Sequence, residues 1–134
     1  MEICSGLHEV MVIEPEPYYR VSTTYFLSRM GYAVIECMHC LHAHNLIRKR
    51  RQLEEPLLLL IADLNETSLA LVQSLRREQV LTPTLFTTPC PDSEAIRCSM
   101  SLEESAVLLK PYSLDEMARV MAQLLYPELY RSGV

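Results

Sequence analysis

The chain lacks a hydrophobic segment long enough to cross a bilayer. Its longest continuous apolar run, Leu57 to Ala62, has the length of a strand, whereas a membrane-spanning helix needs about 18 apolar residues or more. The N-terminus, Met1 to Glu9, contains two glutamates and no basic apolar leader, so a secretory signal is not predicted. We therefore expect a cytoplasmic protein that makes no contact with a membrane.

An excess of positive charge is also missing. The 134 residues include 12 basic and 17 acidic side chains, which give a net charge of -5 at pH 7. Such a chain has no electrostatic field that attracts nucleic acid, and the basic run Arg48 to Arg51 is interpreted as the solvated end of a helix.

The five cysteines are an odd number in a chain without an export signal. They are therefore expected to be reduced thiols rather than a disulfide framework.

A chain of this length suits one domain with a hydrophobic core. Five tracts have the length and aliphatic content of strands. They are Val10 to Ile13, Ala33 to Glu36, Leu57 to Ala62, Thr84 to Thr87 and Val107 to Leu109. Two of the first four are continuously apolar, which is typical of strands that are buried on both faces of a parallel sheet. We predict a domain over residues 8–126, with residues 127–134 as a tail or the start of a connector.

Segments with helical spacing separate these strands. The first is expected to end at Gly31 and carries on one face Tyr19, Thr23, Phe26, Leu27 and Met30. The third runs through Leu71, Val72 and Leu75 and is expected to be capped by Thr67 or Ser68. The others are Cys40 to Arg51, the weaker Asp92 to Leu102, and Leu114 to Leu125. This alternation predicts an α/β fold of the flavodoxin-like, doubly wound type. Its five parallel strands would lie in the order 2-1-3-4-5, with five helices around them.

The tract Lys110 to Glu116 follows the last predicted strand. A lysine at the end of a buried strand needs an anionic partner, because an unpaired ammonium is costly to desolvate. Asp63, which follows the central apolar strand, can supply that partner. Pro111 ends the strand, and Ser113 with Glu116 three residues later forms a capping box for the next helix.

Ligands bind at the carboxyl ends of the strands in folds of this type, so the residues just after each apolar run are the candidate site. These are Glu14, Asp63, Asn65, Thr88 and Lys110. Oxygen ligands from Glu14, Asp63 and Asn65 make a fair site for magnesium. A carboxylate beside a divalent cation and a lysine is a plausible nucleophile toward a phosphoryl donor. Thr88, or alternatively Thr87, can then bond a phosphoryl oxygen.

These pieces, in this order, resemble receiver domains of bacterial two-component response regulators. The matching segments are Val10 to Pro17 with Arg20, Gly31 to Val34, Leu60 to Asn65, Pro83 to Thr88 and Lys110 to Tyr112. The resemblance implies a signalling domain rather than an enzyme, with Asp63 as phosphoacceptor, Thr88 as switch hydroxyl and Lys110 as the family's lysine. It also implies a histidine kinase or phosphotransfer protein as phosphoryl donor, and a partner or homodimer surface within residues 92–125.

Three departures from the family pattern predict an atypical receiver or a pseudo-receiver. Pro15 replaces the second acid of the family's metal-binding pair, although Glu16 offers a substitute carboxylate if the backbone turns it inward. The loop after Asp63 is shortened, because Asn65 leads directly into the next helix. Val107 occupies a strand position where the family often has an aromatic residue.

Alternatives remain open for two groups of residues. Asp63 and Lys110 suit a structural ion pair in a phosphorylation-independent interaction or dimerisation module of a transcription regulator. The tract Cys37 to His44 combines a C-x-x-C spacing with three histidines, which is compatible with a zinc-binding module, with a thioredoxin-like redox pair, or with cysteines that simply fill the core.

Overall fold

Strands and helices alternate through the chain in a computed structural model that describes residues 8–91 and 94–131. The strands are β1 (Glu9–Ile13), β2 (Ala33–Cys37), β3 (Leu59–Asp63), β4 (Thr84–Thr88) and β5 (Ser105–Leu109). The helices are α1 (Pro17–Arg29), α2 (Cys40–Gln52), α3 (Glu66–Arg77), α4 (Glu94–Met100), α5 (Leu114–Leu125) and α6 (Pro127–Arg131). Each of the five predicted strands is therefore present, with ends that differ from the prediction by no more than two residues.

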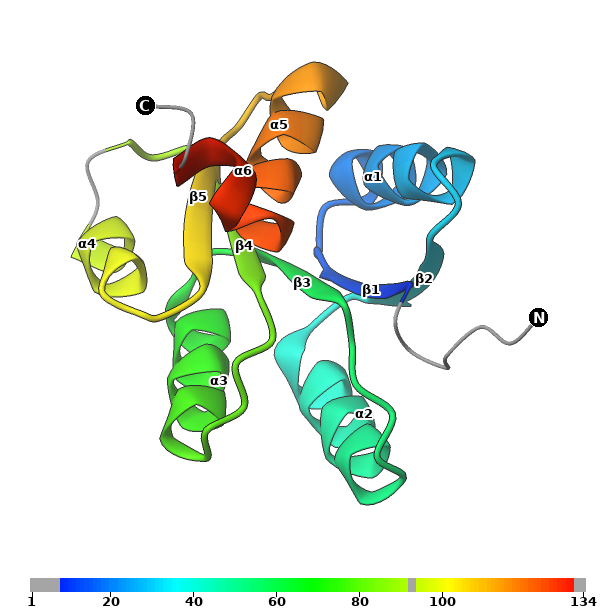
Figure 1. Cartoon of the computed structure of the whole chain (residues 1–134), viewed down its shortest axis with the longest axis vertical. Coiled ribbons are helices and arrows are strands. Elements are labelled where there is room, and N and C mark those ends of the chain that lie inside the picture. The colour runs from blue at the N-terminus through cyan, green and yellow to red at the C-terminus, as the bar shows by residue number, and fades with distance from the viewer. Residues whose placement is uncertain (1–7, 92–93, 132–134) are drawn as a thin grey trace.

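The five strands form one parallel sheet in the order β2-β1-β3-β4-β5, as predicted. Figure 1 shows α1 and α5 on one side of this sheet and α2 and α3 on the other, with α4 beside β5. The five predicted helices are present as α1 to α5, and the segment expected to be a tail contains one further short helix, α6, which contacts α5. No helix in the described ranges is both long enough and apolar enough to span a membrane.

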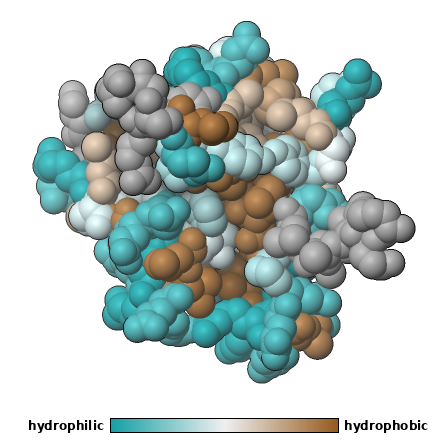
Figure 2. Space-filling view, viewed as in Figure 1, coloured by the Kyte–Doolittle hydropathy of each residue, from teal (hydrophilic) through white to brown (hydrophobic). Residues whose placement is uncertain are grey.

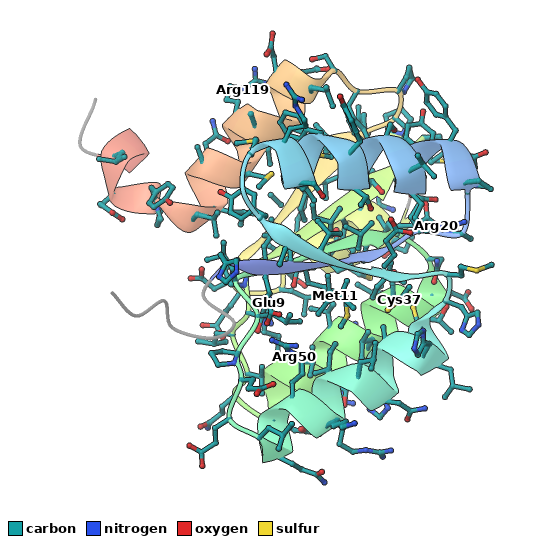
Figure 3. The ribbon with its side chains drawn as sticks, turned by 90° about the vertical axis from the view of Figure 1, so that its right-hand side faces the viewer. Glu9, Met11, Arg20, Cys37, Arg50 and Arg119 are labelled. Atoms are coloured by element: carbon teal, nitrogen blue, oxygen red, sulfur yellow. The ribbon has the colours of Figure 1, made fainter. Side chains whose placement is uncertain are left out.

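Successive residues of each strand enter two separate core clusters, one on each face of the sheet. On β1, Met11 packs into the cluster beneath α2 and α3, whereas Val10 and Val12 pack into the cluster beneath α1 and α5. Figure 3 shows Met11 and Cys37 pointing from β1 and β2 toward α2. Because both faces are covered, β1 from Val10 to Ile13 and β3 from Leu59 to Ala62 are continuously apolar, as expected for a parallel sheet.

The helix ends are fixed by side chains close in sequence. Gly31 has a φ of +96° and follows α1, the left-handed position that favours glycine. Ser113 and Glu116 form the predicted capping box at the start of α5. The predicted cap of α3 was wrong: Asn65 is the N-cap, and Ser68 is its capping-box partner three residues later. Met30, placed on the buried face by its spacing, is exposed because it lies at the end of α1.

Arg76, near the end of α3, forms hydrogen bonds at the edge of the sheet at which the strands begin. Its guanidinium donates hydrogen bonds to the carbonyls of Val80, Thr82, Glu103 and Glu104, at 2.8 to 3.3 Å. Burial lowers the pKa of this guanidinium, while Glu104 and Glu103 act in the opposite direction. One side chain therefore satisfies carbonyls from the loop before β4 and from the loop before β5.

Candidate functional site

Lys110 lies just after β5 and forms two ion pairs at the carboxyl edge of the sheet. Its Nζ is 2.9 Å from Asp63 Oδ1, at the end of β3, and 2.9 Å from Glu14 Oε1, just after β1. The side chains of Lys110 and Glu14 are 9% and 5% exposed, whereas that of Asp63 is 21% exposed. The predicted partner of Lys110 is thus in place, and Glu14 is a second one. Asp63 is the member of this ion cluster that solvent reaches.

The two carboxylates determine the protonation of Lys110. Burial by itself lowers the pKa of this ammonium, but hydrogen bonds and charge from Glu14 and Asp63 outweigh burial, and the pKa is raised above its ordinary value of 10.5. The ammonium therefore stays charged at neutral pH and offsets the negative charge of both acids. Burial also raises the pKa of the nearby Tyr112.

We expect the domain to lose stability at alkaline pH because Lys110 deprotonates. A raised pKa in the folded state gives stability that is fully present below the ordinary value and is lost as pH rises through the folded-state pKa. Urea unfolding of wild type and Lys110→Arg from about pH 9 to pH 12 measures this, because arginine does not titrate in that range. The variant should lose less stability over the range. Equal losses would assign the alkaline effect to Tyr112 and Tyr32, whose pKa values are also raised by burial.

Two aromatic residues border the ion cluster on the side of α1. Lys110 Nζ lies 4.5 Å from the centre of the Tyr19 ring, a cation–π distance, and the rings of Tyr19 and Tyr112 are 5.5 Å apart. Thr23 and Tyr112 share a hydrogen bond of 2.9 Å between their hydroxyls. These contacts connect α1 to the segment between β5 and α5. Tyr19 and Thr23 were not predicted as site residues, although their spacing of one helical turn placed them on one face.

The predicted magnesium ligands differ in how well they fit a cation. Solvent reaches the Asp63 carboxylate, which suits an ion that keeps most of its waters. The nearly buried Glu14 also presents a carboxylate at the sheet edge, but its Oε1 is paired with Lys110 and its Oε2 accepts from the main-chain N–H of Glu16. Asn65 does not fit, because its Oδ1 accepts hydrogen bonds from Ser68 N and Thr67 Oγ1, and its carbonyl accepts from Leu69 N within α3. The shortened loop after Asp63 has turned this residue into a helix cap.

Glu16 does not supply the substitute carboxylate considered from the sequence. Its Oε1 accepts a hydrogen bond of 3.1 Å from Tyr19 N and so caps α1, and the side chain is exposed. Its own main-chain N–H donates to Glu14 Oε2 at 3.0 Å. Arg20 donates to the carbonyls of Glu14 and Pro15, at 2.8 and 3.2 Å. The turn between β1 and α1 is therefore held with Glu16 facing the helix.

The two threonines at the end of β4 have different surroundings. Thr88 Oγ1 accepts a hydrogen bond of 3.2 Å from Cys90 N, and the residue is buried. Thr87 Oγ1 is buried and has no hydrogen-bond partner among the described residues. The hydroxyl preferred from the sequence, Thr88, is thus already engaged with the main chain, while its neighbour is not.

Comparison with solved structures identifies the fold. The chain superposes on the signal receiver domain of an HD domain-containing protein from Pseudomonas fluorescens with a TM-score of 0.78 and 16% identity, covering 99% of this chain and 97% of the other. The chemotaxis protein CheY4 of Vibrio cholerae gives 0.75 and 19%, covering 89% and 99%. HP1043, an orphan response regulator of H. pylori, gives 0.73 and 19%, covering 90% and 98%. The chain has the fold of a receiver domain. In sequence, it matches no protein-family profile and no curated protein.

The receiver fold does not gather the cysteines and histidines of the Cys37 to His44 tract into a metal site. Cys37 is buried in the core cluster beneath α2, and Cys40 is half-buried, whereas His39, His42 and His44 are exposed. No group of three potential metal-binding side chains occurs among the described residues. Burial raises the pKa of both thiols, which does not favour a reactive redox pair. The described part of this tract therefore favours core packing as the role of Cys37 and Cys40 over a zinc site or a redox pair.

A hollow of this receiver fold lies away from the ion cluster. It has a volume of about 330 Å³ and is lined at the opposite edge of the sheet by the end of α2 and by residues before β3 and β4, including Ile47, Leu57 and Val80. Figure 2 shows apolar surface in the region between α2 and α3, with hydrophilic side chains around it. The two arginines that line it are paired, Arg50 with Glu9 and Arg51 with Glu78; Figure 3 shows Arg50 reaching from α2 toward Glu9. The two lining arginines are therefore already paired with carboxylates.

Proposed function

We propose that this chain is a receiver domain of two-component signal transduction, in which Asp63 accepts a phosphoryl group and a protein surface carries the output. The observation that supports this proposal best is the ion cluster of Asp63, Lys110 and Glu14 at the carboxyl edge of the sheet. In an open parallel sheet this edge is where ligands bind. The domain is proposed to act in the cytoplasm and to turn over no substrate of its own.

The proposed chemistry is an attack by a carboxylate oxygen of Asp63 on the phosphorus of a phosphohistidine. The new O–P bond gives an acylphosphate, and the N–P bond to the histidine of the kinase or phosphotransfer protein breaks. Lys110 offsets the negative charge that gathers on the phosphoryl oxygens. Magnesium, held by Glu14 and Asp63, would screen the same charge when bound.

The output surface is proposed to be formed by α4, β5 and α5, within residues 92–125; residues 92 and 93 lie outside the described residues. This surface carries exposed apolar side chains at Met100, Leu109 and Leu114. Leu109 lies next in sequence to Lys110, so a movement of Lys110 in the ion cluster would also move the backbone of this surface. A ligand shifts such a surface only if it binds one conformation more tightly than the other.

We expect beryllofluoride with magnesium to shift the backbone amide resonances around Asp63, Thr88 and Lys110. Beryllofluoride imitates a phosphoryl group on the carboxylate, and its negative charge would draw the Lys110 ammonium away from Glu14. Asp63→Asn, which keeps the size of the side chain and removes its charge, should abolish the shifts. A wild-type spectrum that does not respond at millimolar magnesium would contradict phosphoacceptance.

A second candidate function is a phosphorylation-independent interaction or dimerisation module. Two observations favour it: Asn65 is engaged in capping α3, and Glu16 is engaged in capping α1, so neither adds a metal ligand. Sedimentation velocity with and without beryllofluoride separates the two functions. Self-association that is independent of beryllofluoride and unchanged in Asp63→Asn would support the second candidate.

A further inference from the structure

The Lys110 ammonium contacts an aromatic ring as well as two carboxylates. An ammonium has three N–H groups to place. Asp63 and Glu14 each present an oxygen 2.9 Å from Lys110 Nζ, which accounts for two of them. The remaining neighbour is the ring of Tyr19, whose centre lies 4.5 Å from Nζ. The negative face of an aromatic ring attracts a cation at this distance, and the attraction is stronger where water is kept away.

The Tyr19 ring is held in place by its own helix and by the segment after β5. Tyr19 lies in the first turn of α1, where its main-chain N–H donates to the capping carboxylate of Glu16. The centre of its ring is 5.5 Å from that of Tyr112 and 5.3 Å from that of Tyr18. The Tyr112 hydroxyl is in turn bonded to Thr23, one turn further along α1. The ring is therefore fixed over the ammonium before any ligand arrives.

This arrangement restricts a side chain that is otherwise very mobile. A lysine ammonium sits on a flexible four-carbon stem, and fixing that stem has an entropic cost. The Lys110 side chain is only 9% exposed, and that of Glu14 is 5% exposed, so both lie below the surface. Asp63 is the member of the ion cluster that solvent reaches. An anionic group that binds at Asp63 therefore meets an ammonium whose position Glu14 and the Tyr19 ring have already set.

We propose that Tyr19 is a positioning residue for Lys110: its ring keeps the ammonium beside Asp63 when the ammonium leaves Glu14 for the oxygens of a phosphoryl group on Asp63. This inference rests on the proposed function of Asp63. The ring has no net charge, so it holds the ammonium without competing for it as a third carboxylate would. The lysine side chain is thus ordered in the resting domain, and this order favours binding of the phosphoryl group.

The first test examines the contact in the resting domain, without any phosphoryl analogue. The ring current of Tyr19 shields the ammonium above it, so the Lys110 Nζ protons should resonate further upfield in wild type and Tyr19→Phe than in Tyr19→Leu. Tyr19→Leu should also lower the urea midpoint less in a Lys110→Met background than in wild type, because the cation is then absent. Equal midpoint changes in the two backgrounds would show that the ring only packs against Tyr112, and would overturn the inference.

The second test measures binding of beryllofluoride, with magnesium present, from the amide shifts. Tyr19→Leu removes the ring and keeps an apolar side chain, so the apparent affinity should fall about fivefold. Tyr19→Phe keeps the ring and should bind as wild type does, as should Tyr25→Leu, at an exposed position of the same helix. Equal affinities of Tyr19→Leu and wild type would overturn this inference and leave phosphoacceptance by Asp63 intact. A wild-type protein that does not respond at all would overturn both.

Discussion

Lys110→Met is expected to lower the free energy of unfolding by about 3 kcal/mol. The ammonium is the shared partner of Glu14 and Asp63, and two of the three side chains are nearly inaccessible to water. Methionine keeps the apolar stem but leaves two carboxylates facing each other with no cation between them. Urea unfolding at neutral pH measures the loss. Lys49→Met, at an exposed position of α2, should change stability by less than about 0.5 kcal/mol.

A background without the two carboxylates provides an internal control for this loss. When Glu14→Gln and Asp63→Asn are both present, Lys110→Met no longer leaves an uncompensated negative charge. The loss of stability caused by Lys110→Met should therefore be smaller in that background than in wild type. An equal loss in both backgrounds would indicate lost packing of the lysine stem rather than lost charge pairing.

Phe86→Ala is expected to lower the free energy of unfolding by about 4 kcal/mol. Phe86 is fully buried in the middle of β4, where it packs into the cluster beneath α2 and α3. Alanine would leave a cavity between the sheet and both helices, and the surrounding strands cannot collapse into it without breaking their register. Chemical denaturation with both far-ultraviolet circular dichroism and fluorescence as probes measures the loss.

The chain contains only one other phenylalanine, which makes a matched comparison possible. Phe26, on α1, is only half-buried at the edge of the opposite cluster. Phe26→Ala removes the same atoms from a site that already meets solvent, so the expected loss is about 1 to 2 kcal/mol. Similar losses of unfolding free energy for the two variants would contradict the expectation that the fully buried Phe86 contributes more to stability than the half-buried Phe26.

The fold was predictable because its main signals are local and agree with one another. Continuous apolar runs such as Leu57 to Ala62 indicate a sheet that is covered on both faces, and Gly31 and Ser113 mark helix ends through their own backbone and side-chain chemistry. The errors occur at places where a local signal was ambiguous. Asn65, Thr67 and Ser68 are all good caps, and only the actual path of the chain after Asp63 decides among them.

The site was predictable as a set of strand ends but not as a set of contacts. Parallel strands bring their carboxyl ends to one edge, so Glu14, Asp63 and Lys110 were expected to be neighbours. The sequence does not reveal that Asn65 and Glu16 use their oxygens to cap helices, because the residue type alone does not determine whether its side chain caps a helix or is free to bind an ion. Nor does it reveal that, among the described residues, the Thr88 hydroxyl has a hydrogen-bond partner and the Thr87 hydroxyl has none, since that depends on the face each takes in the sheet.

The guanidinium of Arg76 also has a consequence for motion. It bonds carbonyls on both sides of the gap between the loop before β4 and the loop before β5. Neither loop can open to solvent alone without leaving donors of this arginine unpaired. Their amide protons should therefore exchange with deuterium as one cooperative unit, at a common opening free energy, although more than twenty residues separate the two loops along the chain.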